Sequence, residues 1–231
     1  MNSPHYYRFS RLLFIGLAMF VGACSQTPDL QVTKESKHHW DLRQQQLEPI
    51  NEWEIHARAA ILVKNEQLED KVYPVGINWS RQQERFSMVI EAPFGQGVIR
   101  IESNRSIDDD KQFKLTLADG KYRLGPTPEA LLEDLLGWSI PVSGLKSWVK
   151  GLPEPDVDYS YELYGTGQLR SLRQDSWLIN YLAYFPADQQ PQSLPRRMYL
   201  KHKSLGIKIV IERWAKLEAV IEPESIFPDF D

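Results

Sequence analysis

Apolar residues recur at every second position through most of this 231-residue chain. The first such run contains the apolar residues Trp53, Ile55, Ala57, Ala59, Ile61 and Val63. A period of two is typical of strands that bury one face, because successive side chains of a strand point to opposite faces of the sheet. Further runs of this kind lie near residues 73–79, 86–90, 98–101, 113–117, 122–124, 157–163, 177–185, 198–200 and 207–211. The sequence therefore predicts a mainly β protein built as a meander of antiparallel strands.

Two short apolar segments interrupt the strands and predict helices. Thr127 offers an N-cap and Pro128 suits the first helical position of the earlier segment. The second helix is expected over residues 143–150, and another short helix is expected before the strands, over residues 38–48. A helix pair inserted between strands could cover a cavity inside a closed or partly closed sheet. We therefore expect a helical lid around residues 127–151.

The N-terminal residues predict a secreted, lipid-anchored protein. Two arginines precede an apolar run at 12–23, which is too short to span a bilayer as a helix and is typical of a secretory signal. Small residues end this run directly before Cys24, the only cysteine, as in the bacterial lipobox, where the thiol is acylated and the chain is cut. We expect a signal peptide over 1–23, a lipidated flexible tether over 24–36 and one domain over 37–231.

The residue after the expected acylation site indicates the membrane to which the protein is sent, and the net charge indicates which partners it can bind. Position 25 is a serine rather than an aspartate, and lipoprotein sorting as known in enteric bacteria then directs a protein to the outer membrane. Removal of the signal peptide takes away two arginines and no acids, so the formal net charge changes from −4 to −6. A mildly acidic chain without a basic cluster argues against nucleic acid as a partner.

No motif for catalysis or metal binding stands out in the sequence. There is no glycine-rich phosphate loop, no nucleophile elbow and no His-Glu-x-x-His pair. His38 and His39 would point to different sides of a helix, and the acidic run at 108–110 is typical of a solvated turn. We therefore expect a protein that is not an enzyme and that holds no metal and no cofactor beyond the acyl groups on Cys24.

The stretch EAPFGQG at residues 91–97 places a large aromatic residue in a tight turn between two predicted strands. Pro93 presets φ for the second position of such a turn and Gly95 suits the fourth, so that Phe94 takes the third. Turns face water, so this ring either folds back onto a neighbouring loop or contacts something outside the chain.

Aromatic residues are frequent, and many occupy alternating strand positions: the chain has 7 Trp, 10 Tyr and 9 Phe. On the inner face of a curved sheet such side chains fill a core or line a cavity for an apolar ligand, and the strand pattern alone does not separate inner from outer faces. The candidates for cavity residues are Trp79, Phe86, Met88 and Ile90 on the strands and Leu131, Leu135 and Trp148 on the lid.

Five segments together resemble the family of the outer-membrane lipoprotein receptor LolB. In chain order they read HHWDLRQQQLEPINEWEIHARAAI, APFG, GWSIPVSGLKSWVKGLPEP, SLPRRMYL and IKIVIERW. The most specific part is the pattern GxxIPxxxLxxWxxGLP, formed here by Gly137, Ile140, Pro141, Leu145, Trp148, Gly151, Leu152 and Pro153. The order and spacing of all five segments carry the resemblance, which extends over most of the mature chain.

The resemblance implies a half-open antiparallel β-barrel with an inserted α-helical lid enclosing an apolar cavity. It implies an outer-membrane lipoprotein, anchored on the periplasmic face, that accepts acylated lipoproteins from the periplasmic carrier LolA and inserts them into the inner leaflet of the outer membrane. The partners would be LolA, the acyl chains of the cargo and the outer-membrane lipids, and we expect a monomer. In the family a protruding apolar residue, commonly leucine, is implicated in insertion, and Phe94 occupies the matching place between Pro93 and Gly95.

The residues alone leave two other classes of protein open. A lipocalin-like lipoprotein that binds a small apolar ligand would share the barrel and the lipid, but it would not require an exposed apolar hairpin tip. A scaffold subunit of an envelope assembly machine would bind a protein partner and should lack an accessible cavity. Binding of an apolar fluorescent probe would separate the scaffold from the other two classes.

Overall fold

The computed structural model of the chain describes residues 32–64, 69–82, 85–93, 97–104, 112–189 and 192–219. The expected signal peptide, Cys24, Phe94, Gly95 and the acidic run at 108–110 lie outside these residues. Within the described ranges, no helix combines the length and the hydropathy that a membrane span requires.

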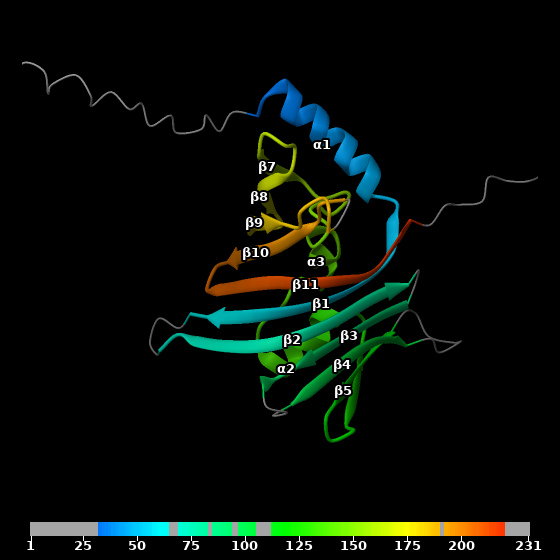
Figure 1. Cartoon of the computed structure of the whole chain (residues 1–231). Coiled ribbons are helices and arrows are strands. Elements are labelled where there is room, and N and C mark those ends of the chain that lie inside the picture. The colour runs from blue at the N-terminus through cyan, green and yellow to red at the C-terminus, as the bar shows by residue number, and fades with distance from the viewer. Residues whose placement is uncertain are drawn as a thin grey trace, which may run out of the picture. The chain divides into compact units, whose positions relative to one another are not determined.

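Eleven antiparallel strands form one sheet in the described part of the chain (Figure 1). Their spatial order is β6-β5-β4-β3-β2-β1-β11-β10-β9-β8-β7. The strands are β1 (Ile50–Val63), β2 (Lys71–Gln82), β3 (Arg85–Glu91), β4 (Val98–Asn104), β5 (Gln112–Leu117), β6 (Tyr122–Gly125), β7 (Tyr159–Leu163), β8 (Leu169–Gln174), β9 (Trp177–Tyr184), β10 (Pro195–His202) and β11 (Leu205–Ala219). Because β6 and β7 stand at opposite ends of this order, the sheet is not closed.

The first and last strands pair at the centre of the sheet. β1 is antiparallel to β11, with Trp53 opposite Leu217 and Val63 opposite Leu205. On its other side β1 pairs with β2. The strands β2–β6 therefore form one half of the sheet and β7–β10 the other, and the helical segment crosses between the halves.

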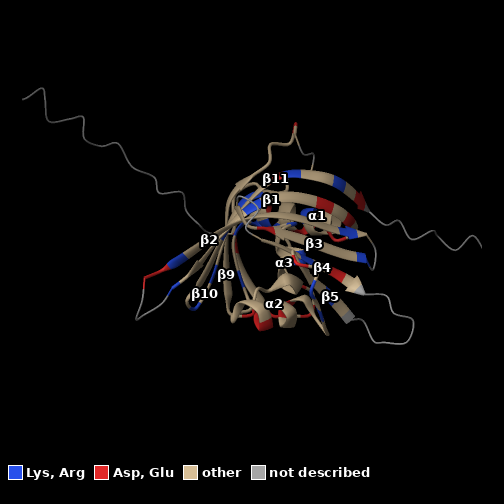
Figure 2. Ribbon diagram, turned by 90° about the horizontal axis from the view of Figure 1, so that it is seen from below, with Lys and Arg blue, Asp and Glu red and all other residues tan. Residues whose placement is uncertain are grey.

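Three helices accompany the sheet in the described residues: α1 (Lys34–Leu47), α2 (Pro128–Leu136) and α3 (Val142–Trp148). α2 begins and ends as predicted, because the Thr127 side chain accepts a hydrogen bond from the Ala130 backbone N–H and Gly137 adopts the left-handed conformation. The curved sheet surrounds α3, and α2 lies across the opening between its two halves (Figure 2). The predictions of a mainly β fold, an open antiparallel barrel and an inserted helical lid are confirmed.

α1 begins earlier than the sequence pattern suggested. The Thr33 side chain accepts a hydrogen bond from the Ser36 backbone N–H at 3.1 Å and caps a helix that starts at Lys34. The segment expected to be a tether over 24–36 therefore overlaps the helix at its C-terminal end. The prediction missed this start because only the residues after His38 show an apolar stripe.

α1 packs on the turn between β7 and β8. Trp40 is buried, and its ring centroid lies 5.7 Å from that of Tyr161. A Cβ added at Gly167 would lie 2.5 Å from the Cβ of His39, so only glycine allows this close approach. The Arg43 guanidinium donates hydrogen bonds to the backbone carbonyls of Gln192 and Ser193. These contacts fix the helix to the β7–β10 half of the sheet.

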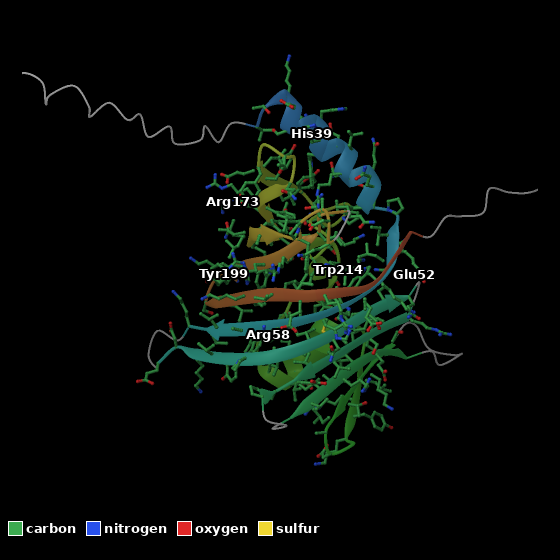
Figure 3. All side chains as sticks on the ribbon, viewed as in Figure 1. His39, Glu52, Arg58, Arg173, Tyr199 and Trp214 are labelled. Carbon is green, nitrogen blue, oxygen red and sulfur yellow. The ribbon has the colours of Figure 1, made fainter. Side chains whose placement is uncertain are left out.

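The alternation of β1 separates the two faces of the sheet as predicted. The inner face carries Trp53, Ile55, Ala57, Ala59 and Ile61, all 6% exposed or less. Arg58 of β1 and Tyr199 of β10 lie on the opposite, outer face (Figure 3), where the Arg58 Nε is 2.5 Å from Glu212 Oε1 on β11. The lid and the inner face thus enclose the apolar core.

Candidate functional site

A small apolar cavity lies between the inner face of the sheet and the lid. Its volume is about 40 Å³, and apolar side chains form its wall. The sheet contributes Ile55, Ala57, Ala59, Ile61, Val75, Ile77, Trp79, Met88, Ile90, Ile207 and Ile209, and the helical segment contributes Leu132, Ile140, Leu145 and Val149. The accessible surface of this wall is apolar throughout and suits a hydrocarbon chain.

The cavity exists because β1 carries two small residues in its middle. Ala57 pairs with Ile77 of β2, and Ala59 pairs with Val75. Larger side chains at these two alanines would fill the space above them. Leu132 of α2 covers the cavity and is fully buried.

The present volume is far too small for an acyl chain. A single water molecule needs about 10–15 Å³ of such volume, so a cavity of about 40 Å³ has room for only a few waters. The structure therefore describes the site with the lid shut, and a chain could enter only if the wall moved apart.

α3 is tied to the β7–β10 half of the sheet by buried hydrogen bonds. The Trp148 Nε1–H donates to Gln174 Oε1 at 2.9 Å, and the Tyr181 hydroxyl donates to the Trp148 carbonyl at 3.1 Å. Burial raises the pKa of Tyr181 well above its usual value, so this hydroxyl stays protonated far above physiological pH. The Lys150 ammonium donates to the carbonyls of Leu47 and Ile50 and links α3 to α1 and β1.

Gln174 makes the largest number of the hydrogen bonds that hold α3 and the segment after it, and its side chain is 2% exposed. Besides Trp148, its Oε1 accepts from the Glu154 backbone N–H, and its Nε2 donates to the carbonyls of Glu154 and Val157. A leucine at this position would leave the buried indole N–H of Trp148 without a partner and would also remove the three part-buried hydrogen bonds to Glu154 and Val157.

We therefore expect Gln174→Leu to lower the free energy of unfolding by about 3–5 kcal/mol, since each buried polar group left unpaired costs about 1–3 kcal/mol. Urea denaturation measures the change. Gln189→Leu is the control, because Gln189 is exposed in a turn. Equal stability of the two variants would show that the hydrogen bonds of Gln174 do not hold the segment.

α2 is held by fewer polar contacts than α3. The Glu129 side chain accepts a hydrogen bond from the Ser143 backbone N–H at 2.5 Å, and Asp134 forms an ion pair with Arg123 of β6 at the surface. Its remaining attachment is apolar: Leu131 packs against Gly125, where an added Cβ would lie 2.8 Å from the leucine Cγ. Exposed ion pairs contribute little to stability, so apolar packing supplies most of what holds α2.

A row of aromatic rings crosses the inner face beside the cavity. The ring centroids of Trp214 and Trp53 are 6.0 Å apart, those of Trp53 and Trp79 are 4.8 Å apart, and both pairs are edge-to-face. The row continues through Phe86 and Phe113, at 6.0 and 5.7 Å. Trp79 lines both the apolar cavity and a neighbouring hollow of about 220 Å³ that also contains the two phenylalanines.

The residues proposed from the sequence fall into three groups. Trp79, Met88 and Ile90 lie in the wall of the apolar cavity, whereas Phe86 lines the neighbouring hollow. Leu131 packs under β6, Leu135 is half-buried on α2, and Trp148 is held by Gln174 and Tyr181. Pro93 is half-buried at the start of the hairpin tip, while Phe94 and Gly95 lie outside the described residues.

The sequence reasoning missed most of the cavity wall. The alternation had placed Ile55, Ala57, Ala59 and Ile61 on one face, but it could not say that this face is the inner one. Pairing with β2 supplies the missing signal, since Ile55 lies opposite Trp79. The roles of Gln174 and Lys150 were also not predicted, because the residues around a polar side chain in the sequence do not show whether it is buried in the fold. Across the residues that the structure describes, no three His, Cys, Asp or Glu side chains come together as a metal site would require.

Comparison with known proteins gives a consistent result. The family model "Outer membrane lipoprotein LolB" matches residues 51–214. A protein of Pseudomonas savastanoi pv. phaseolicola named "Outer-membrane lipoprotein LolB" is 31% identical over 205 residues, covering 88% of this chain and 94% of its own. A protein of Pseudomonas fluorescens with the same name is 32% identical over 176 residues, covering 76% and 80%.

Among solved structures, a DUF1329 family protein from Desulfovibrio piger aligns with a TM-score of 0.45 and 11% identity, over 82% of this chain and 95% of its own. At that TM-score the likeness does not establish a shared fold.

Proposed function

This chain belongs to the outer-membrane lipoprotein LolB family, and on that premise we propose that it accepts acylated lipoproteins from the periplasmic carrier LolA and inserts them into the inner leaflet of the outer membrane. The observation that carries the proposal is the apolar cavity under the lid, whose wall suits acyl chains. Family membership favours this function over the lipocalin-like carrier and the scaffold subunit. The acyl groups that anchor the protein at the outer membrane would be attached to Cys24.

Acyl chains cannot pass through water during the transfer. Exposing each methylene costs about 0.8 kcal/mol, so the chains of one lipoprotein would cost tens of kcal/mol as an upper bound. The chains must therefore move from the cavity of the carrier directly into the cavity of the receptor, and from there into the bilayer. The direction then follows from tighter binding at each successive site, with the membrane as the final acceptor.

Opening of the cavity requires one wall to move, and α2 is the wall with the weakest attachment. α3 is fixed to the sheet through Gln174, Tyr181 and Lys150. α2 has mainly the packing of Leu131 and Leu132, the hydrogen bond of Glu129 and the exposed ion pair of Asp134 with Arg123. We infer that α2 swings away from β5 and β6 while α3 stays in place.

We propose that the hairpin tip between β3 and β4 delivers the lipoprotein to the membrane. The Ala92 backbone N–H donates to the Gly97 carbonyl at 2.9 Å, which closes the base of the tip. Phe94 lies between these two residues in the sequence. Immersing one phenylalanine in the bilayer contributes roughly 1.5–3 kcal/mol, a contact that can form and release, whereas the acyl groups on Cys24 provide the lasting anchor.

A cavity-filling substitution tests the binding site. Ala59→Phe should weaken binding of an apolar fluorescent probe by about 10- to 150-fold, because the ring would take the place of a part of the probe whose burial contributes roughly 1.5–3 kcal/mol. The matched control is Ala60→Phe, since the next residue of β1 points to the other face. Fluorescence titration measures both variants. If both bind the probe as the unmodified protein does, the ligand does not enter this cavity.

Transfer from the carrier tests the function itself. Protein with Cys24→Ser, which cannot be acylated, should take a radiolabelled lipoprotein from loaded LolA and co-elute with it in size-exclusion chromatography. Unloaded LolA and a lipoprotein without acyl chains serve as controls. If no lipoprotein passes from a competent carrier to this protein, the receptor function is refuted. The lipocalin-like carrier and the scaffold subunit would then be the functions to test.

A further inference from the structure

The hollow beside the apolar cavity combines an aromatic floor with a cationic rim. Its volume is about 220 Å³, and the rings of Trp79, Phe86 and Phe113 line it. Arg81 and Lys146 line the same hollow, from β2 and α3 respectively, and Arg85 of β3 joins them. Because Trp79 also lines the apolar cavity, the hollow and the cavity adjoin at this residue.

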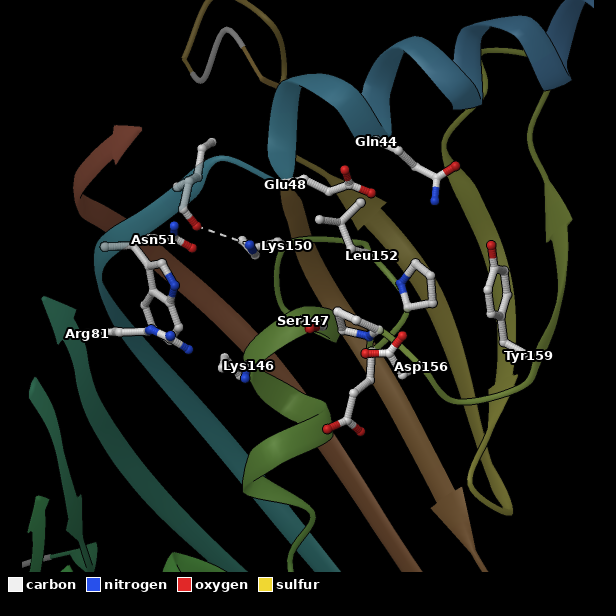
Figure 4. A pocket seen from close by; sticks show the side chains of 15 residues that line it. Gln44, Glu48, Asn51, Arg81, Lys146, Ser147, Lys150, Leu152, Asp156 and Tyr159 are labelled. Atoms are coloured by element: carbon white, nitrogen blue, oxygen red, sulfur yellow. Dashed lines mark hydrogen bonds between the residues drawn. The ribbon is translucent and has the colours of Figure 1, made fainter. Parts of the chain in front are cut away.

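A wider cleft adjoins this hollow on the other side of the same two cations. It has a volume of about 560 Å³ and lies between the end of α1, the start of β1, α3 and the segment that follows it (Figure 4). Arg81 and Lys146 line it together with Lys150. In the view of Figure 4 these three side chains occupy one side of the cleft and Asp156 and Tyr159 the other.

The cations are close enough to affect each other's charge. Burial, followed by the charges of Arg81 and Lys146, lowers the pKa of Lys150 to about 8. The carboxylate of Glu48 acts in the opposite direction, but it has a smaller effect on that pKa than either cation. The charge of Lys146 also acts on the carboxylate of Glu154, which offsets part of it. The described residues that line the hollow of about 220 Å³ include three cations and no acid, so an added anion would be attracted to that hollow.

Two buried donors at this place have no acceptor among the described residues. They are the indole Nε1–H of Trp79, a residue that is 3% exposed, and the Nε–H of Arg81. Both groups can only donate hydrogen bonds. Buried donors are nearly always paired in folded proteins, so a water molecule or a ligand oxygen is the partner that both N–H groups lack.

We propose that the mouth of the apolar cavity binds the phosphate of a phospholipid, with Arg81, Arg85 and Lys146 around the phosphate and an acyl chain in the cavity. The inference rests on the proposed function, because the same cavity receives the acyl chains of the cargo. A phosphate supplies both the negative charge that the rim attracts and the acceptor oxygens that the two donors lack. Continuity with the apolar wall through Trp79 selects a lipid rather than a soluble anion.

A phospholipid chain could occupy the apolar cavity only while α2 is displaced, because the closed cavity of about 40 Å³ is too small for it. Binding of the phospholipid would therefore depend on the same opening as binding of the cargo.

The test compares three ligands on the mature chain carrying Cys24→Ser. They are dioctanoyl phosphatidylglycerol, dioctanoylglycerol, which has the same chains without phosphate, and inorganic phosphate. Binding is measured by isothermal titration calorimetry. We expect the phospholipid to bind at least about tenfold more tightly than either of the others, since two charged hydrogen bonds are worth more than 1.4 kcal/mol.

A double substitution locates the site. Arg81→Gln with Lys146→Gln should remove the preference for the phospholipid and leave binding of dioctanoylglycerol unchanged, which also shows that the variant is folded. The matched control is Arg197→Gln with Lys201→Gln, which removes the same charges from exposed positions of β10.

Each contrary result has a distinct meaning. Equal binding of the phospholipid and dioctanoylglycerol refutes the phosphate site while the proposed function stands. Binding of inorganic phosphate as tight as that of the phospholipid refutes the lipid as the ligand. Failure of both lipids to bind refutes the phosphate site and the acyl-binding function together.

Discussion

Phe94→Glu should leave acceptance of cargo from LolA intact and reduce its delivery to liposomes by about 10- to 100-fold. Phenylalanine contributes roughly 1.5–3 kcal/mol on entering a bilayer, and each 1.4 kcal/mol corresponds to about tenfold. A carboxylate at the same place loses this contribution and resists burial in hydrocarbon. Delivery is measured as labelled lipoprotein that floats with the liposomes after centrifugation.

Two further variants separate the role of the hairpin tip from a general effect of charge. Phe94→Leu should deliver cargo nearly as well as the unmodified protein, because the side chain stays apolar. Ala118→Glu places the same carboxylate in another exposed turn, between β5 and β6, and should have no effect. Delivery by Phe94→Glu at the unmodified rate would show that the aromatic tip does not insert.

A disulfide between α2 and β6 should stop cargo acceptance. The Cγ of Leu131, which marks where a cysteine Sγ would lie, is 2.8 Å from a Cβ added at Gly125. Gly125→Cys with Leu131→Cys therefore has the geometry of a disulfide. With Cys24→Ser no other cysteine is present. Oxidation would hold α2 shut over a cavity of about 40 Å³.

The same double variant under reducing conditions is its own control. Reduced protein should accept cargo from LolA, and oxidised protein should accept none above background. Gel filtration of labelled lipoprotein measures both. Acceptance by the oxidised form would show that chains enter without displacement of α2, and the assignment of α2 as the moving wall would be wrong.

The strands could be predicted from the sequence because each depends on local information. Alternation along 53–63 determines which side chains share a face, and a turn such as Asp119-Gly120 joins neighbouring strands. The pairing of β1 with β11 could not be predicted in this way. It joins residues far apart in the sequence, such as Trp53 and Leu217, which are 164 positions apart, and no local pattern specifies it.

The candidate site was predictable only in part for the same reason. Trp79, Met88 and Ile90 were identified because they alternate on strands next to a helical segment. Trp148 is apolar, as a lid residue should be, but it does not line the cavity. Its indole N–H donates a hydrogen bond to Gln174, which lies 26 residues further along the chain. The cationic rim was missed because Arg81 and Lys146 belong to elements that meet only in the folded chain.

Photochemical cross-linking shows which face of the sheet the acyl chains of the cargo contact. A lipoprotein whose acyl chains carry a diazirine is transferred from LolA to the Cys24→Ser protein, irradiated and digested for mass spectrometry. Adducts should fall on inner-face residues of the cavity such as Ala59, Met88 and Ile209. Adducts confined to the outer face, on residues such as Arg58 and Tyr199, would contradict the account, because the acyl chains would then never have entered the space between the sheet and the lid.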